Sequence, residues 1–175
     1  MKEIVDLFQQ AQAAVAAADW EKLFGLLDDS TLQAVGGNSL LWLASQPSTC
    51  WGDFPQLAIA ELRELGDKIV ESARKVQASP QDMQLSLAHR DLVLRHRDAL
   101  HKETRGQAVS LGRIESLRRS LGQGGSISSS LFLGERLDQV KVEGNQAVAR
   151  RLHPHGASQL LHFRRRRGGW RIKLI

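Results

Sequence analysis

The side chains of this sequence best placed to do chemistry are basic ones near its carboxyl end, and their chemistry is anion binding. Four arginines follow one another from Arg164 to Arg167, and Arg171 and Lys173 come shortly after them. The two groups flank Gly168-Gly169, a dipeptide typical of a two-residue β-hairpin loop. With both glycines in the loop, Arg167 faces Trp170, Arg166 faces Arg171 and Arg164 faces Lys173.

Alternation along the two strands sorts these residues onto opposite faces. One face is expected to be apolar, and there the Arg167 guanidinium lies over the Trp170 ring. The other face carries four cations: Arg164, Arg166, Arg171 and Lys173. Like charges directly opposed across two strands destabilise a sheet. An interaction that compensates the repulsion between these cations is therefore expected.

Three explanations are open for this basic face. Charged strands are often solvated and guard against edge aggregation. Acidic residues of this chain or of a second copy offer internal compensation, namely Asp28, Asp29, Glu61, Glu64 and Glu71. The third explanation is an external polyanion, and charge asymmetry favours it. Residues 141–175 hold nine Lys or Arg and one acid, a net charge of +8, whereas residues 1–100 hold nine bases and fourteen acids, a net charge of −5.

The class of polyanion is left open between an acidic protein and nucleic acid. Single-stranded nucleic acid is usually held by aromatic stacking as well as by charge. The chain has no Tyr, and Trp170 is expected on the other face of the hairpin. An acidic protein is therefore at least as good a candidate as RNA or DNA.

A second group of residues is suited to acid–base chemistry in a pocket. It consists of His89, Asp91 and His96 in a helical stretch and His162 in a strand. His89 and His96 are seven residues apart, too far to chelate one metal ion unaided, so we expect no metal and no cofactor. Cys50 has no His within thirty residues and is interpreted as a packing residue. The stretch 122–126, Gly-Gln-Gly-Gly-Ser, leads from a helix into a strand, the reverse of a phosphate loop, and is interpreted as a flexible connector.

Helical periodicity dominates the first 122 residues. Apolar spacing predicts helices over about 4–15, 19–27, 53–76, 82–105 and 110–121, with Asp19 and Asp53 as N-terminal caps. Gly36-Gly37 is expected to end a short piece that follows Asp28, and the class of the segment 40–43 is left open. These five or six helices make one layer of the fold.

From Ser126 the period changes to two, which predicts an antiparallel meander of about five strands over residues 126–175. The hairpin at Gly144-Asn145 admits two registers: a three-residue loop pairs Val142 with Val148, and a two-residue loop pairs Lys141 with Val148. Helices followed by strands indicate an α+β fold, here a single domain over residues 1–175 with a helical layer on a curved sheet.

Two stretches of the chain resemble a known superfamily. The first holds Ala18-Asp19-Trp20 and Leu26-Leu27-Asp28-Asp29-Ser30; the second runs from Val140 to Val148 and from Leu160 to Ile172, ending in Gly-Gly-Trp-Arg-Ile. Over residues 5–35 and 127–175 the chain resembles the nuclear-transport-factor-two-like superfamily, to which ketosteroid isomerase belongs. The resemblance implies a cone-shaped α+β domain and a homodimer. In enzymes of this kind it also implies a pocket lined by a carboxylate or His with Tyr or Asp donors, and a chain without Tyr lacks one of these.

The expected function is a non-enzymatic binding or adaptor module that presents its basic sheet face to an acidic partner. The alternative is a small-molecule-binding protein, or an enzyme of the isomerase or hydratase type, with its pocket between helices and sheet. A single cysteine fits a reducing compartment. The chain shows no signal-peptide pattern and no apolar run near the roughly 20 residues that span a bilayer. We therefore expect a cytoplasmic protein without a membrane partner.

Overall fold

The computed structural model describes residues 1–174 and has an α+β fold, as the sequence predicts. Six α-helices within these residues precede the strands: α1 (Lys2–Ala16), α2 (Trp20–Gly25), α3 (Asp29–Ser45), α4 (Ile59–Ala78), α5 (Met83–Thr104) and α6 (Ala108–Ser120). A short 3-10 helix, η1 (Ser48–Trp51), follows α3. Within the described residues, every helix is too short or too polar to cross a lipid bilayer.

The strands form one antiparallel meander at the carboxyl end of the chain. They are β1 (Arg136–Glu143), β2 (Gln146–Leu152), β3 (Ser158–Arg166) and β4 (Gly169–Lys173), in that order across the sheet. The chain between α2 and α3 runs beside β4: the Ile172 N–H donates to the Leu26 carbonyl, and the Asp28 N–H donates to the Ile172 carbonyl, both at 2.8 Å. This short parallel bridge, Leu27 with Ile172, covers the outer edge of β4.

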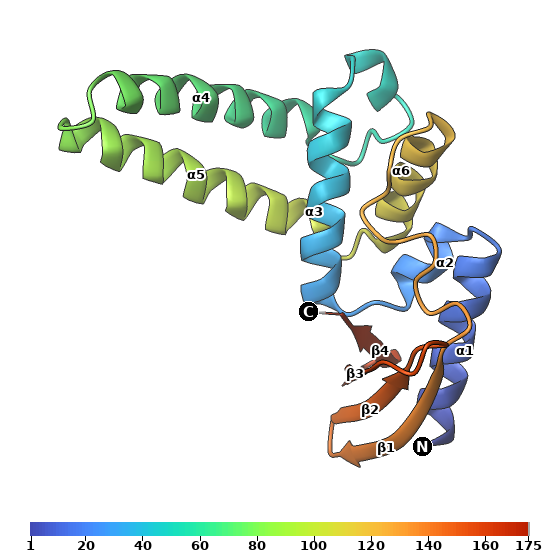
Figure 1. Cartoon of the computed structure of the whole chain (residues 1–175). Helices are drawn as coiled ribbons and strands as arrows, with labels where there is room; N and C mark the ends of the chain where they lie inside the picture. Colours follow the sequence, from blue (N-terminus) through green and yellow to red (C-terminus); the bar gives the residue numbers. More distant parts are fainter. Residues whose placement is uncertain (175) are drawn as a thin grey trace.

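One hydrophobic core joins the amino-terminal helices to the sheet. Helix α1 lies along one face of the sheet and contacts β4 and β1 (Figure 1). Ile4, Phe8 and Leu23 from the helices and Phe163 and Ile172 from the strands are all buried in this core. Trp20 and Trp42 are buried as well.

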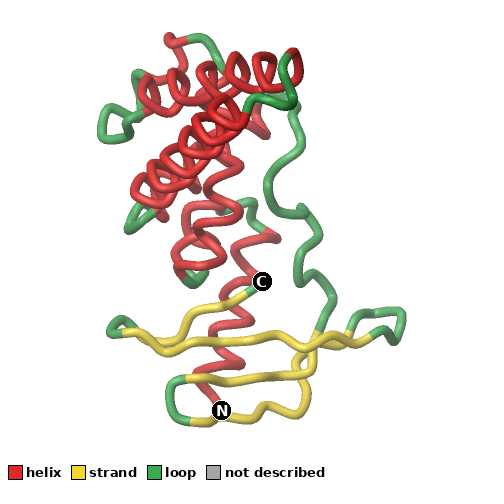
Figure 2. The backbone as a smooth tube through the Cα atoms, turned by 90° about the vertical axis from the view of Figure 1, so that its left-hand side faces the viewer, coloured by secondary structure: helices red, strands yellow, loops and turns green. Residues whose placement is uncertain are grey.

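Helices α4 and α5 form an antiparallel arm that projects away from this core (Figure 1). The fully buried residues of the two helices lie only at the base of the arm: Ile59 and Leu62 in α4 and Thr104 in α5. The sheet lies at the opposite end of the molecule from the arm (Figure 2). The helices that were expected to form one layer therefore divide into a part that builds the core and a part that extends beyond it.

Three local predictions are wrong. Gly36-Gly37 does not end a helix but lies inside α3, where Gly36 packs against α6: a Cβ there would meet the Leu111 side chain at 2.5 Å. The helix predicted from Asp53 begins instead at Ile59, where the Ala58 N–H donates to the Glu103 carboxylate at 3.0 Å.

The meander predicted from Ser126 begins instead at Arg136, because residues 127–133 form a series of turns, so the sheet has four strands in the described residues and not five. Ile127 and Phe132 are nevertheless buried, whereas Leu133 is exposed, so burial along these turns does not follow the alternation of a strand.

Candidate functional site: a basic face of the sheet

The hairpin of β3 and β4 carries the basic residues, and its register differs from the prediction. Arg166 pairs with Gly169, Arg164 with Arg171, and Phe163 with Ile172, so the two loop residues are Arg167 and Gly168. The predicted pairing of Arg166 with Arg171 is therefore wrong. Gly169 takes a φ of 104° directly after the loop, a value open to glycine at little cost. This register sets Ile172 opposite Phe163, and both side chains are buried.

The shift amounts to two residues, which leaves the sorting of side chains unchanged because strands alternate with a period of two. Leu161, Phe163, Trp170 and Ile172 are buried on the core face. Arg164, Arg166, Arg171 and Lys173 share the outer face, together with His162. We call these four cations the basic face. Arg164 and Arg166 are exposed, and Arg171 and Lys173 are half-buried.

Arg164 and Arg171 lie directly opposite each other across the two strands. The Arg171 guanidinium donates to the Trp170 carbonyl at 2.9 Å and to the Gly168 carbonyl at 3.3 Å. These bonds hold it against the hairpin without neutralising its charge. The charge of Arg171 therefore stays on the hairpin, and Arg164 is its partner directly across the two strands.

Among the described residues, one carboxylate reaches the basic face. Arg166 forms an ion pair with Asp29 at the start of α3, at 3.3 Å, as the internal explanation predicted for that residue. Asp28 instead is buried and caps α3, accepting from the Thr31 N–H at 2.9 Å. Within residues 1–174, neither Arg164, Arg171 nor Lys173 has a carboxylate within ion-pair distance. Three of the four cations are thus left to solvent or to a partner.

The Arg167 side chain was predicted to lie over Trp170, and that prediction is wrong. In the observed register Arg165 is opposite Trp170, and its guanidinium carbon lies 5.8 Å from the ring centre. The indole N–H of Trp170 donates to the Glu3 carboxylate at 3.0 Å. Trp170 is thereby fixed on the core side and offers no stacking surface to a ligand on the basic face.

Two further cations extend the outer face onto β2 and β1. Lys141 pairs with Val148, which settles the hairpin at Gly144-Asn145 as the two-residue alternative, and Arg150 pairs with Asp138. A bulge at Gln139, where φ is 51°, places Asp138 and Lys141 on the same side although they are three residues apart. Sequence reasoning missed this extension because the bulge shifts the alternation of β1.

Of the two added cations, Lys141 and Arg150, the charge of Arg150 is neutralised. Its guanidinium forms an ion pair with Asp138. The hydrogen bond from Arg150, followed by one from the Gln139 N–H, lowers the pKa of the Asp138 carboxyl below its usual 3.8. The surplus positive charge therefore concentrates on β3 and β4.

The residues proposed for a pocket lie at separate places. The Nδ1 atom of His89 lies 2.6 Å from the Ser72 hydroxyl, between the two helices of the arm, and Asp91 is exposed on α5. His96 lines a cavity of about 340 Å³ against α3, where its Nε2 atom is buried without a hydrogen-bond partner in the described residues. His162 is exposed on the outer face of β3. Among residues 1–174, no hydrogen bond or ion pair joins any two of these four side chains.

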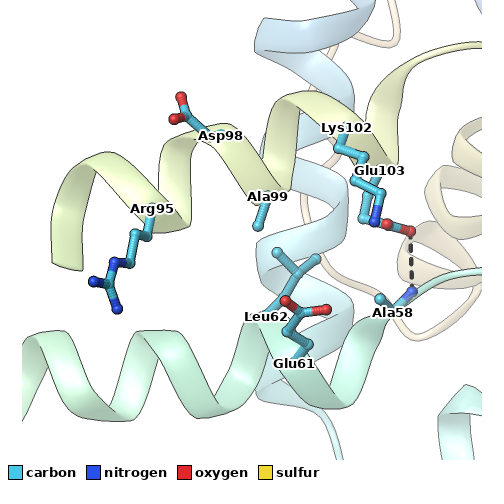
Figure 3. A pocket seen from close by; sticks show the side chains of 8 residues that line it. All are labelled: Ala58, Glu61, Leu62, Arg95, Asp98, Ala99, Lys102 and Glu103. Atoms are coloured by element: carbon cyan, nitrogen blue, oxygen red, sulfur yellow. Dashed lines mark hydrogen bonds between the residues drawn. The ribbon is translucent and has the colours of Figure 1, made fainter. Parts of the chain in front are cut away.

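Another cavity, at the base of the arm, is lined by charged residues of α4 and α5 (Figure 3). Arg95 and Asp98 point away from its centre, and Glu103 turns toward the Ala58 N–H, whose hydrogen bond it accepts. Glu103 therefore serves as the cap that starts α4. Within residues 1–174, no group of three His, Cys, Asp or Glu side chains is arranged to hold a metal ion.

A buried polar cluster was missed by sequence reasoning. Glu115 of α6 is fully buried, forms an ion pair with Arg119 at 2.8 Å, and accepts from the Ser126 N–H at 3.0 and 3.1 Å. Gln123 accepts from the Trp42 indole N–H at 2.6 Å. The stretch 122–126 was interpreted as flexible, yet it is held at both ends by these bonds. The only signal in the sequence was the spacing of Glu115 and Arg119, four residues apart on a helix.

Comparison of the chain with family models, with curated proteins and with solved structures found no match. The resemblance to the nuclear-transport-factor-two-like superfamily, and the homodimer that it implies, stay predictions.

Proposed function

We propose that this protein is a non-enzymatic binding module whose basic face docks an acidic segment of a partner protein. The observation that carries the proposal is the set Arg164, Arg171 and Lys173 on a hydrogen-bonded sheet, none of which has an ion-pair partner within residues 1–174. Two of these cations are held opposite each other, and a bound carboxylate relieves their repulsion. The Arg171 guanidinium is already held by two backbone carbonyls, so this charge attracts an anionic partner without first having to be ordered.

The choice of an acidic protein over nucleic acid rests on the surroundings of the cations. Among residues 1–174, the outer face of β3 and β4 presents no Phe, Trp or Tyr for bases to stack on, since Phe163 and Trp170 are buried on the core side. An acidic peptide needs no stacking partner. The exposed Leu160, on the same face of β3, offers an apolar contact beside the charges.

The proposal includes a cytoplasmic location, supported by the unpaired Cys50. A catalytic pocket built from His89, Asp91, His96 and His162 receives no support from their positions, and we do not propose one.

The test is binding of a fluorescent polyglutamate peptide, measured by anisotropy over a series of salt concentrations. We expect binding that weakens steeply with salt, and at least a tenfold loss of affinity in the double variant Arg164→Glu plus Arg171→Glu. Arg74→Glu plus Arg90→Glu is the matched control: it makes the same change in net charge on the exposed surface of the arm. Equal losses in the two variants would show that net charge alone attracts the peptide, and the basic face would not be the site.

A single-stranded oligonucleotide of equal charge separates the two classes of polyanion. For a single strand, removing one phosphate-binding cation makes the slope of log affinity against log salt shallower by about 0.7. The proposal predicts weaker binding of the oligonucleotide than of the peptide at 0.15 M salt. The opposite order would replace the acidic protein by nucleic acid as the partner.

A further inference from the structure

A second anion site is indicated beside the tip of the β3–β4 hairpin, where three distant parts of the chain meet. A cavity of about 250 Å³ is bounded by Asp29, Leu32 and Gln33 of α3, by His101, Thr104 and Arg105 at the end of α5, and by Arg166 of β3. It lies outside the stretch of β3 and β4 that carries Arg164, Arg171 and Lys173. Its volume suits a small molecule or a single side chain, and not an extended polymer.

The groups lining this cavity are mainly donors. Arg105 and Arg166 carry permanent charge and several N–H groups each, and the His101 imidazole supplies an N–H in either protonation state. Asp29 is the one acid among the lining residues. Its carboxylate engages Arg166, and within residues 1–174 no carboxylate lies within ion-pair distance of Arg105.

The walls of the cavity are built before any ligand arrives. Thr104 is 3 % exposed, and its hydroxyl donates to the His101 carbonyl at 3.1 Å, a bond that stabilises the last turn of α5. On the other side, buried Asp28 caps α3 through the Thr31 N–H and the Ser30 hydroxyl. Arg105 at the end of α5 and Arg166 at the end of β3 line the same space beside these two held helix ends.

We propose that this cavity binds a phosphate monoester, with Arg105 and Arg166 as the charged donors and Asp29 as an internal competitor for Arg166. Guanidinium groups match the oxygens of phosphate in a two-pronged geometry, and two of them suit its double charge. A carboxylate ligand carries one charge and merely replaces Asp29. The dianion displaces Asp29 from Arg166 and engages Arg105 at the same time, so the phosphate group is the ligand that this cavity selects.

Arg166 belongs both to the basic face and to this cavity, but the two proposals can be tested apart, because the acidic peptide is assigned to Arg164, Arg171 and Lys173. Isothermal titration with phosphoserine and with inorganic phosphate, at constant ionic strength, tests the cavity. We expect one phosphate per chain with a dissociation constant of about 1 mM or lower. Acetate is expected to bind at least tenfold more weakly.

Three variants test which side chains bind the phosphate and which compete with it. Arg105→Gln is expected to weaken phosphate binding about tenfold or more, because it removes a charge-assisted donor. Asp29→Asn is expected to tighten it about threefold to tenfold, because Arg166 is released. Arg167→Gln is the control: it removes the same charge from the neighbouring hairpin loop and is expected to change binding less than twofold.

Phosphate binding no tighter than acetate binding would overturn the proposal, as would equal losses in Arg105→Gln and Arg167→Gln. Weaker binding in Asp29→Asn would also contradict it, because Asp29 would then support the ligand and not compete with it. Arg105 and Asp29 are both exposed, so none of these outcomes depends on a variant that fails to fold. Absence of polyglutamate binding by the unmodified protein, with phosphate binding intact, would instead reject the proposed function alone.

Discussion

Replacing Arg164 by Glu should make the protein more stable while it weakens binding of an acidic partner. Arg164 and Arg171 are directly opposed, and the β-carbons of such cross-strand partners lie about 4.5–5.5 Å apart. Cross-strand charge pairs contribute roughly 0.2–1 kcal/mol, and like charges act with the opposite sign. Arg164→Glu removes a repulsion and adds an attraction. Because Arg164 is exposed and screened by solvent, we expect a gain of about 0.5–1 kcal/mol in the free energy of unfolding at low salt.

The assay is urea unfolding of a double-mutant cycle. Arg164→Glu and Arg171→Glu should each stabilise, whereas the double variant opposes two carboxylates and should lose the gain. A coupling energy of about 1 kcal/mol is expected at 20 mM salt. It should disappear near 1 M salt, where the Debye length is about 3 Å.

The same cycle tests the register. Arg166 lies diagonal to Arg171, at the wider separation of about 7–8 Å that is typical of diagonal residues, and is already paired with Asp29. A cycle on Arg166 and Arg171 should therefore show less than half the coupling. Equal or greater coupling for that pair would mean that the hairpin adopts the register expected from its two glycines. Absence of coupling in both cycles would refute the idea that repulsion across the basic face matters.

Three other predictions concern the interior and β1, and chemical unfolding checks each. Gly112→Ala puts a Cβ 2.5 Å from the Cα of residue 21 in α2, so we expect the free energy of unfolding to fall by about 1–3 kcal/mol. Gly37→Ala, with no atom within 4 Å, should raise it by about 0.5–1 kcal/mol. Equal effects of the two substitutions would contradict the close approach of α2 and α6. Glu115→Leu leaves the Arg119 charge without its buried partner and should lower the free energy of unfolding by about 3 kcal/mol or more, while Glu115→Gln should lower it less. A Leu variant as stable as the unmodified protein would show that the buried pair does not matter for stability. Because the pKa of Asp138 is lowered, its stabilising effect is complete above the usual 3.8 and is lost as pH falls through the lowered value. The stability difference between wild type and Asp138→Asn should therefore shrink from pH 6 to pH 3, and a difference that grows would show the sign to be wrong.

The sequence predicted element types well where a local signal and the tertiary structure agree. Asp19 caps α2 and accepts from the Lys22 N–H at 3.0 Å, as its position before an apolar stretch suggested. The sorting of the basic face was also correct, because alternation survives a register shift of two residues. The pairing itself was not predictable, since it depends on where the core places Ile172.

The remaining errors have tertiary causes. Gly36-Gly37 has the composition of a helix end, yet α3 continues because Gly36 lets α6 approach closely. Asp53 has the local features of a cap, yet the N–H of Ala58, the residue before α4, donates to Glu103, which is 45 residues away. The cavity beside Arg166 joins residues from three elements, and no local pattern contains that information.

The short bridge between Leu27 and Ile172 has a consequence for how the chain folds. The two residues are 145 positions apart, and the Thr31 side chain accepts from the Leu174 N–H at 2.9 Å across the same junction. Contacts between residues so far apart in sequence cost conformational entropy, because a long loop must close, and they slow folding. We therefore expect the contacts between the amino-terminal helices and the final strand to form late in folding. Until they meet, the first stretch of the chain keeps its apolar surface exposed and is open to capture by other unfolded chains.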